Sequence, residues 1–126
     1  MINVDEQIVY WRENAIEDLG VSKDLLRGGK VRHGLFFLHL ACEKMLKTHV
    51  CKATQDLAPR THDLVGLGAR TTVKLTEDHR QVPDDLNAFN IEGQYPSMLT
   101  TPPSLKEARD MRKSASVFFK WLTKEL

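Results

Sequence analysis

The side chains that could do chemistry begin with three charges on an otherwise apolar stretch. Glu43, Lys44 and Lys47 interrupt a run of apolar residues that extends from Leu35 to Val50 at helical spacing. Glu43 and Lys47 stand four positions apart with the carboxylate nearer the N-terminus, which is the better orientation for an ion pair on a helix. A helix that is apolar around most of its circumference is a buried one, so these charges need partners or water.

Potential partners stand in the segment that follows, at Arg60 and His62. Together with Lys47 they could supply the base, the acid and the cation that metal-independent cleavage of RNA requires, provided that this segment folds against the helix. The same three side chains and Lys44 could instead bind the phosphates of a nucleotide, while Tyr95 stacks on its base. The second interpretation predicts that these five side chains meet in one open cleft.

A structural interpretation uses the same residues without a ligand. In it, Glu43 and Lys47 tie the helix to the turn that contains His62, whose ring satisfies the buried carboxylate, and Asp63 caps a short helix. Gln94 is a further candidate for polar support. Under this interpretation the polar set specifies the fold, and Glu43 supports a site without reacting in it.

His39, Cys42 and Glu43 have a spacing that could hold a metal ion, but a core histidine is the simpler interpretation. Their neighbours are apolar, and no second cluster of His and Cys stands elsewhere in the chain. We therefore predict no metal and no cofactor. Cys42 and Cys51 lie on one predicted helix about 13 Å apart along its axis, which is too far for a disulfide. Reduced thiols in a cytoplasmic protein are the expectation.

The composition predicts one folded domain and argues against several classes of protein. With 126 residues, of which 41% are hydrophobic, the chain can bury a core without disulfides or metal. A net charge of +1 gives no global basic field of the kind that indicates nucleic-acid binding, and leaves only a local basic patch open. The sequence shows no signal-peptide pattern and no apolar run of about 20 residues, so we expect no membrane segment.

The elements that must position these residues all have helical patterns. Apolar residues recur at spacings of three and four after Asp5, a candidate N-cap, until Gly28 and Gly29 mark a turn, and a second helix from Val31 to Cys51 returns antiparallel to the first. The sequence predicts an all-α, antiparallel up-and-down bundle of four main helices plus one short helix over residues 1–126. The other expected helices are a short one capped by Thr61, one opened by Pro83 that carries Leu86, Phe89 and Ile91 and ends at Gly93, and a terminal one from the capping box of Ser104 and Glu107 to Lys124.

The order and spacing of several short motifs resemble the HEPN domain family. The motifs are A-x-E-K-x-L-K at residues 41–47, T-H-D-L at residues 61–64, Tyr95 followed by Pro96, and an amphipathic terminal helix. The resemblance covers nearly the whole chain. It implies a bundle of four to five helices, commonly a homodimer, that is frequently encoded beside a minimal nucleotidyltransferase as a toxin–antitoxin-like pair. Gln94 stands where family members often have Arg before the Tyr-Pro pair, which weakens an inherited anion-binding role.

Some HEPN proteins are metal-independent ribonucleases, whose signature is Arg, four to six residues, then His, near the start of the last helix. No His follows His79 in this chain, and the match at Arg27 and His33 spans the predicted turn between the first two helices. We therefore expect a nucleotide-binding and interaction module that acts with a nucleotidyltransferase partner. A ribonuclease toxin that uses some of Arg27, His33, Arg60 and His62, and a non-catalytic dimerisation bundle, are the alternatives.

Overall fold

The computed structural model describes residues 3–89 and 103–126. These residues form helices and connections, with no strand among them, so the all-α prediction is confirmed. The helices are α1 (Val4–Arg27), α2 (Val31–Thr54), α3 (Leu64–Ala69), α4 (Glu77–Leu86), the single 3₁₀ turn η1 (Asn87–Phe89) and α5 (Leu105–Lys124). No helix in the described part of the chain is long and apolar enough to span a membrane.

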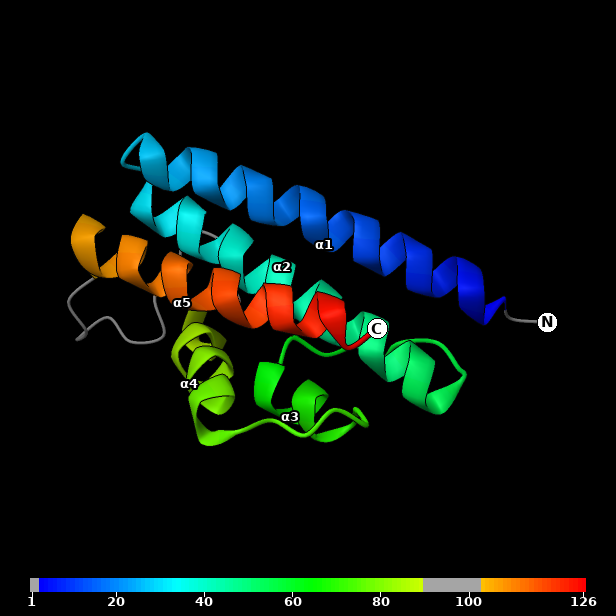
Figure 1. Ribbon diagram of the computed structural model, residues 1–126. Helices are drawn as coiled ribbons and strands as arrows, with labels where there is room; N and C mark the ends of the chain where they lie inside the picture. Colours follow the sequence, from blue (N-terminus) through cyan, green and yellow to red (C-terminus); the bar gives the residue numbers. More distant parts are fainter. Residues whose placement is uncertain (1–2, 90–102) are drawn as a thin grey trace.

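A tight turn at Gly28 and Gly29 joins α1 and α2 into a long antiparallel hairpin (Figure 1). Gly29 has a φ of +79°, in the left-handed region that glycine adopts without a Cβ clash. Beyond the turn the two helices make a close contact at Gly34, where an added Cβ would lie 2.5 Å from Cδ2 of Leu26. The glycines therefore set both the turn and the spacing of the hairpin.

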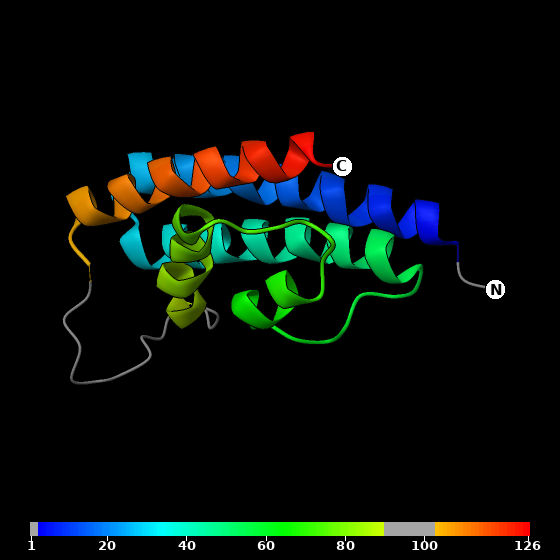
Figure 2. The same ribbon diagram turned by 60° about the horizontal axis from the view of Figure 1, so that its bottom comes forward.

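The third long helix, α5, packs beside the hairpin and runs in the same direction as α2 (Figures 1 and 2). The short helices α3 and α4 follow α2 in the sequence and precede α5. Both pack on the same side of the three long helices. α4 runs across the long helices, and its His79 ring stacks on Trp121 of α5 with 3.8 Å between ring centroids. The helical bundle thus consists of three long helices, with α1 antiparallel to both α2 and α5, and the short pair packed on them.

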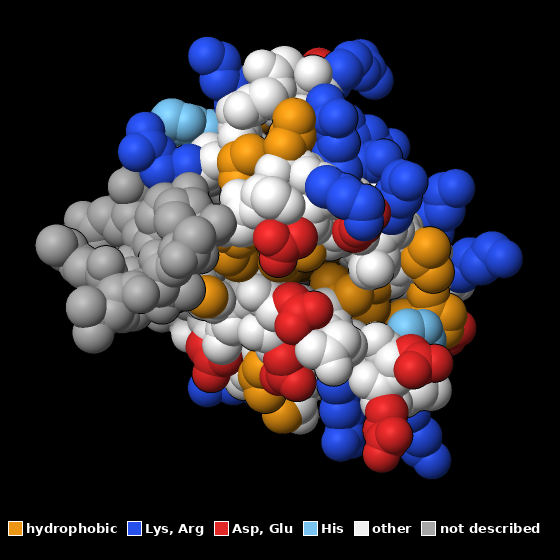
Figure 3. Space-filling view, turned by 90° about the vertical axis from the view of Figure 1, so that its left-hand side faces the viewer, with side chains coloured by type: hydrophobic (Ala, Val, Ile, Leu, Met, Phe, Trp, Pro, Cys, Tyr) orange, Lys and Arg blue, Asp and Glu red, His pale blue; other side chains and the backbone are white. Residues whose placement is uncertain are grey.

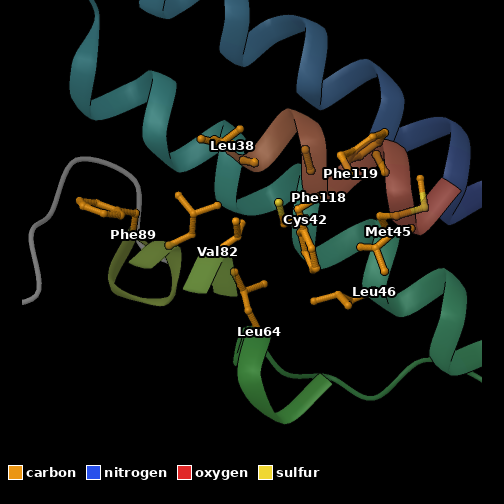
Figure 4. Close-up of a cluster of buried hydrophobic side chains, with 14 of the residues drawn as sticks. Leu38, Cys42, Met45, Leu46, Leu64, Val82, Phe89, Phe118 and Phe119 are labelled. Carbon is orange, nitrogen blue, oxygen red and sulfur yellow. The ribbon is translucent and has the colours of Figure 1, made fainter. Parts of the chain in front are cut away.

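The hydrophobic core lies where α2 meets the other helices (Figure 4). α2 is buried along most of its length, as expected of a helix that is apolar nearly all round. Burial of each large core side chain contributes about 1.5–3 kcal/mol, so this central helix carries much of the stability. The labelled core residues are Leu38, Cys42, Met45 and Leu46 of α2, Leu64 of α3, Val82 of α4, Phe89 of η1, and Phe118 and Phe119 of α5.

The helix ends follow capping chemistry, with small shifts from the predicted residues. Ser104 and Glu107 form the expected capping box at the start of α5, with each backbone N–H bonded to the other side chain at 3.2 and 3.1 Å. Asn3 caps α1 in place of Asp5, because its side chain accepts the N–H of Glu6 at 3.1 Å. Asp5 falls in the first turn of α1, where its charge suits the helix dipole.

The prediction that Pro83 opens the fourth helix is wrong. α4 begins at Glu77, where Thr76 accepts the N–H of His79 at 3.3 Å, and Pro83 lies buried inside the helix. The helix forms because Val82 and Leu86, four positions apart, face the core and outweigh the hydrogen bond that proline removes. The predicted positions Ile91 and Gly93 lie outside the described residues.

Candidate functional site

A buried carboxylate, Glu43, forms the centre of the polar cluster on α2. The residue is 3% exposed. Lys47 Nζ donates to its Oε2 at 3.1 Å, and Nδ1 of His62 lies 2.8 Å from its Oε1. A carboxylate can only accept, so His62 donates through Nδ1. Both oxygens of Glu43 are therefore engaged by groups from α2 and from the segment before α3.

The segment before α3 is held against α2 by a second histidine. Nε2 of His39 lies 3.0 Å from the carbonyl oxygen of His62, which can only accept, so His39 carries its proton on Nε2. Its bare Nδ1 lies 3.8 Å from Oε1 of Glu43 and has no hydrogen-bond partner among the described residues. Burial lowers the pKa of His39, so its ring is neutral and structural.

His62 is the part of this cluster that solvent reaches. Its side chain is 64% exposed, although its Nδ1 is fixed on a carboxylate that is almost fully buried. Its Nε2 has no hydrogen-bond partner among the described residues, so it is open to a ligand. Arg60, two residues earlier, is also exposed. The arrangement presents an oriented imidazole and an exposed guanidinium at the surface.

Lys44 and Lys47 do not reach this surface. Lys44 Nζ pairs with Oδ2 of Asp18 on α1 at 2.6 Å. Lys47 is 6% exposed and its Nζ lies 5.1 Å from the ring centroid of Trp11, also on α1, within the range of a cation–π contact. The five predicted ligand-binding residues therefore do not meet in one cleft: Lys44 and Lys47 face α1, and Tyr95 lies outside the described residues with Gln94.

Asp63 marks the N-terminus of α3, two residues after the predicted cap. Thr61 instead accepts the N–H of Asp63 through its hydroxyl at 3.1 Å. Asn87, just after α4, accepts the N–H of Leu64 at 2.8 Å and donates to Oδ1 of Asp63 at 3.0 Å. The neighbouring N–H of Gly66 and the Asn87 amide together lower the pKa of Asp63. The polar groups at the N-terminus of α3 thus find their hydrogen-bond partner in Asn87, outside α3.

Sequence reasoning missed Asp18 and Asn87. Asp18 carried a signal, because it occupies a position between Ala15 and Ser22 on the buried stripe of α1, where a charge needs a partner. Asn87 carried no signal, since its contact with Asp63 spans 24 residues and depends on how α4 crosses the bundle.

The alternative Arg–His pairs do not assemble with this site. Arg27 is exposed at the end of α1 and contacts Asp24 at 3.5 Å, whereas His33 lies in the first turn of α2, about 15 Å along the helix from Glu43. Arg32 and His39, with six residues between them, also fit the Arg–His signature, but Arg32 is exposed and His39 is fully buried.

Metal ligation and thiol chemistry have no support in the described part of the chain. No group of three or more His, Cys, Asp or Glu side chains there could hold a metal ion. Cys42 and Cys51 are buried free thiols, and burial raises the pKa of Cys42 to about 12. A thiol with so high a pKa is unreactive at neutral pH.

Together the fold and the site define a small α-helical bundle domain built on a long hairpin, with a buried carboxylate that orients a surface histidine. A family model of the HEPN domain matches residues 8–126, and the chain belongs to that family.

Two solved structures share the fold. The protein TT1696 from Thermus thermophilus is 21% identical, with a TM-score of 0.79 over 95% of this chain and 98% of its own. ST0689, an archaeal HEPN homologue, is 18% identical, with a TM-score of 0.72 over 99% of this chain and 98% of its own. No curated protein matches the chain. At these identities the structures show a common fold and leave the chemistry of the site to the residues of this chain.

Proposed function

We propose that this HEPN protein is a nucleotide-binding and interaction module that acts with a minimal nucleotidyltransferase. The observation that carries the proposal is the exposed His62 ring fixed at 2.8 Å on the buried carboxylate of Glu43. Lys47 balances the charge of Glu43, which leaves the guanidinium of Arg60 and the open Nε2 of His62 as the groups that can meet an anion at this edge. Such an edge suits a phosphate group.

The residues of the site divide into contacts and supports. His62 and Arg60 contact the phosphate through Nε2 and the guanidinium, and Tyr95 stacks on the base. Glu43, Asp63 and Gln94 are supports. Lys44 and Lys47 support the site by fixing α2 against α1, since their ammonium groups are already paired.

The proposed partner is one that the family resemblance implies. HEPN domains are commonly homodimers that pair with a minimal nucleotidyltransferase in a toxin–antitoxin-like arrangement, and we extend this to a homodimer in the cytoplasm. Native mass spectrometry of the chain alone and with a nucleotidyltransferase encoded by a neighbouring gene measures both associations.

Calorimetric titration with ATP tests the nucleotide claim. We expect His62→Ala and Arg60→Ala each to weaken binding about ten- to hundredfold, as loss of a charge-assisted hydrogen bond worth about 1.5–3 kcal/mol predicts. Arg32→Ala is the matched control, because Arg32 is also exposed and lies in the first turn of α2, about 16 Å along the helix from Glu43. The absence of wild-type binding, or equal affinities in all variants, refutes this part of the proposal.

A ribonuclease is the second candidate, and the same pair of residues favours it. An imidazole with one nitrogen on a carboxylate and the other open is suited to general acid–base catalysis. Cleavage through the 2′-OH needs both an acid and a base, and the described residues near Glu43 present one exposed histidine, so binding is our first choice.

Incubation with RNA under chelation decides between the two. Cleavage that is lost in His62→Ala, reduced in Glu43→Gln and kept in His33→Ala establishes the enzyme. RNA that stays intact at every protein concentration excludes it. If neither nucleotide binding nor cleavage occurs, the polar centre is structural and the chain is a dimerisation bundle.

A further inference from the structure

A basic pocket that His62 does not line lies toward the end of the molecule that carries the α1–α2 turn. It lies between α1 and α5 and has a volume of about 370 Å³. Figure 3 views this end and shows Lys and Arg side chains gathered in its upper right part, with most acidic side chains in the lower half. The pocket is lined by Lys23, Leu26, Arg27, Arg109 and Arg112.

One of the four cations is fixed by the end of α1. Nη2 of Arg109 lies 3.4 Å from the carbonyl oxygen of Leu26 and 3.5 Å from that of Arg27, and can donate to both. Both are carbonyls of the last turn of α1, and that of Leu26 also accepts the N–H of Gly29 at 3.1 Å. Arg109 therefore ties α5 to α1 and neutralises the negative end of the α1 dipole beside the pocket.

The other cations have little counter-charge. Lys23 and Arg112 are half-buried and form no hydrogen bond or ion pair with any described residue. Arg27 contacts Asp24 at 3.5 Å, but both side chains are more than three-quarters exposed, so solvent screens the pair. The whole chain carries a net charge of only +1, so the concentration of positive charge in this pocket is local. Like charges that line one pocket repel each other, and a bound anion relieves that repulsion.

The residue types narrow the class of anion. Three of the four cations are arginines, whose planar guanidinium groups match phosphate oxygens two at a time. No aromatic side chain lines the pocket among the described residues, so it has no platform there for a base. The volume suits a compact anion with several charges.

We propose that this pocket is a second anion site that binds linked phosphate groups, with pyrophosphate as the simplest ligand. It is separate from the His62 site, because its lining residue Leu26 lies against Gly34 of α2, about 13 Å along the helix from Glu43. The phosphates come either from a free di- or triphosphate or from the backbone of a nucleic-acid strand.

Calorimetric titration with sodium pyrophosphate near physiological salt tests the site, with sulfate as the comparison anion. We expect Arg112→Gln and Lys23→Gln each to weaken pyrophosphate binding at least fivefold, and the double variant to abolish it. Lys113→Gln is the matched control, since Lys113 is an exposed cation on α5 outside the pocket. Arg109 is left intact because it anchors α1, and circular dichroism melts verify that each variant folds.

Two further titrations separate the sources of phosphate and the two sites. A single-stranded oligonucleotide that binds, loses affinity in the same variants and is displaced by pyrophosphate identifies a nucleic-acid backbone, whereas binding of pyrophosphate alone identifies a small molecule. His62→Ala retains pyrophosphate binding if the two sites are independent. The proposal is overturned if the wild type binds neither ligand, if sulfate binds equally well, or if Arg112→Gln and Lys23→Gln bind like the control.

Discussion

At the scale of single residues, Glu43 decides how much of the polar cluster is structural. Its removal leaves Lys47 buried against Trp11 without a counter-charge. We expect Glu43→Ala to lower the free energy of unfolding by about 3 kcal/mol, because breaking a buried ion pair from one side leaves an uncompensated charge. Urea denaturation measures the loss.

The exposed pair Lys106–Asp110 provides the control for Glu43. It has the same four-residue spacing and a distance of 3.4 Å, with its side chains 88% and 58% exposed. Lys106→Ala should therefore change stability by less than about 0.5 kcal/mol. Losses of equal size in the two variants would show that burial does not strengthen the Glu43 pair.

The sequence predicted the ion pair of Glu43 with Lys47, but it did not predict which residues surround Lys44 and Lys47. A spacing of four residues on a helix fixes which side chains of that helix meet, so the contact with Lys47 followed from the sequence. The contact of Lys44 with Asp18 did not, since it depends on the rotation of α1 against α2. For the same reason, two lysines expected in an open cleft were found against another helix.

At the scale of elements, the close approach of the hairpin helices gives alanine substitutions at two glycines opposite effects on stability. A Cβ at Gly34 would lie 2.5 Å from the Leu26 side chain, whereas a Cβ at Gly20 on α1 meets nothing within 4 Å. We expect Gly34→Ala to destabilise the protein by about 1–3 kcal/mol through overpacking. Gly20→Ala should stabilise it by about 0.5–1 kcal/mol, because alanine favours a helix. Thermal unfolding followed by circular dichroism measures both, and shifts of the same sign would contradict the packing argument.

Local signals predicted the elements well where the chemistry is local. The glycine pair that ends α1 and the capping box that opens α5 act within a few residues, and both lie where the sequence placed them. α4 was misplaced because its first turns are polar and only Val82 and Leu86 face the core. Tertiary packing formed that helix through Pro83, which propensity alone would exclude from a helix interior.

At the scale of the whole molecule, two buried histidines couple global stability to pH. His39 bonds to the backbone before α3, and Nε2 of His49 donates to the carbonyl of Leu122 on α5 at 2.7 Å. Burial lowers the pKa of both below the ordinary 6.5, with Glu43 and Glu125 as weaker opposing charges. The unfolded chain then binds more protons than the native one at mildly acid pH, so stability is full above about pH 6.5 and falls as the pH drops toward the lowered pKa values.

The pH effect is measurable by urea denaturation at about pH 7.5 and 5.5. We expect the wild type to be less stable at the lower pH. The double variant His39→Gln, His49→Gln keeps an amide donor at each position and removes the titrating ring, so its stability should change less over the same interval. Asp63, whose pKa is lowered below 3.8, acts only at more acid pH. An unchanged pH dependence in the double variant would assign the effect to other groups.

The parallel course of α2 and α5 also sets an order of folding. The hairpin contacts of α1 with α2 arise between neighbouring segments, whereas His49 and Leu122 meet across 73 residues of chain. Closing a loop of that length has a larger entropic barrier than forming the hairpin. We therefore expect the hairpin to form first and α5 to dock later, so that the face of α2 which α5 covers is exposed in the early folding states.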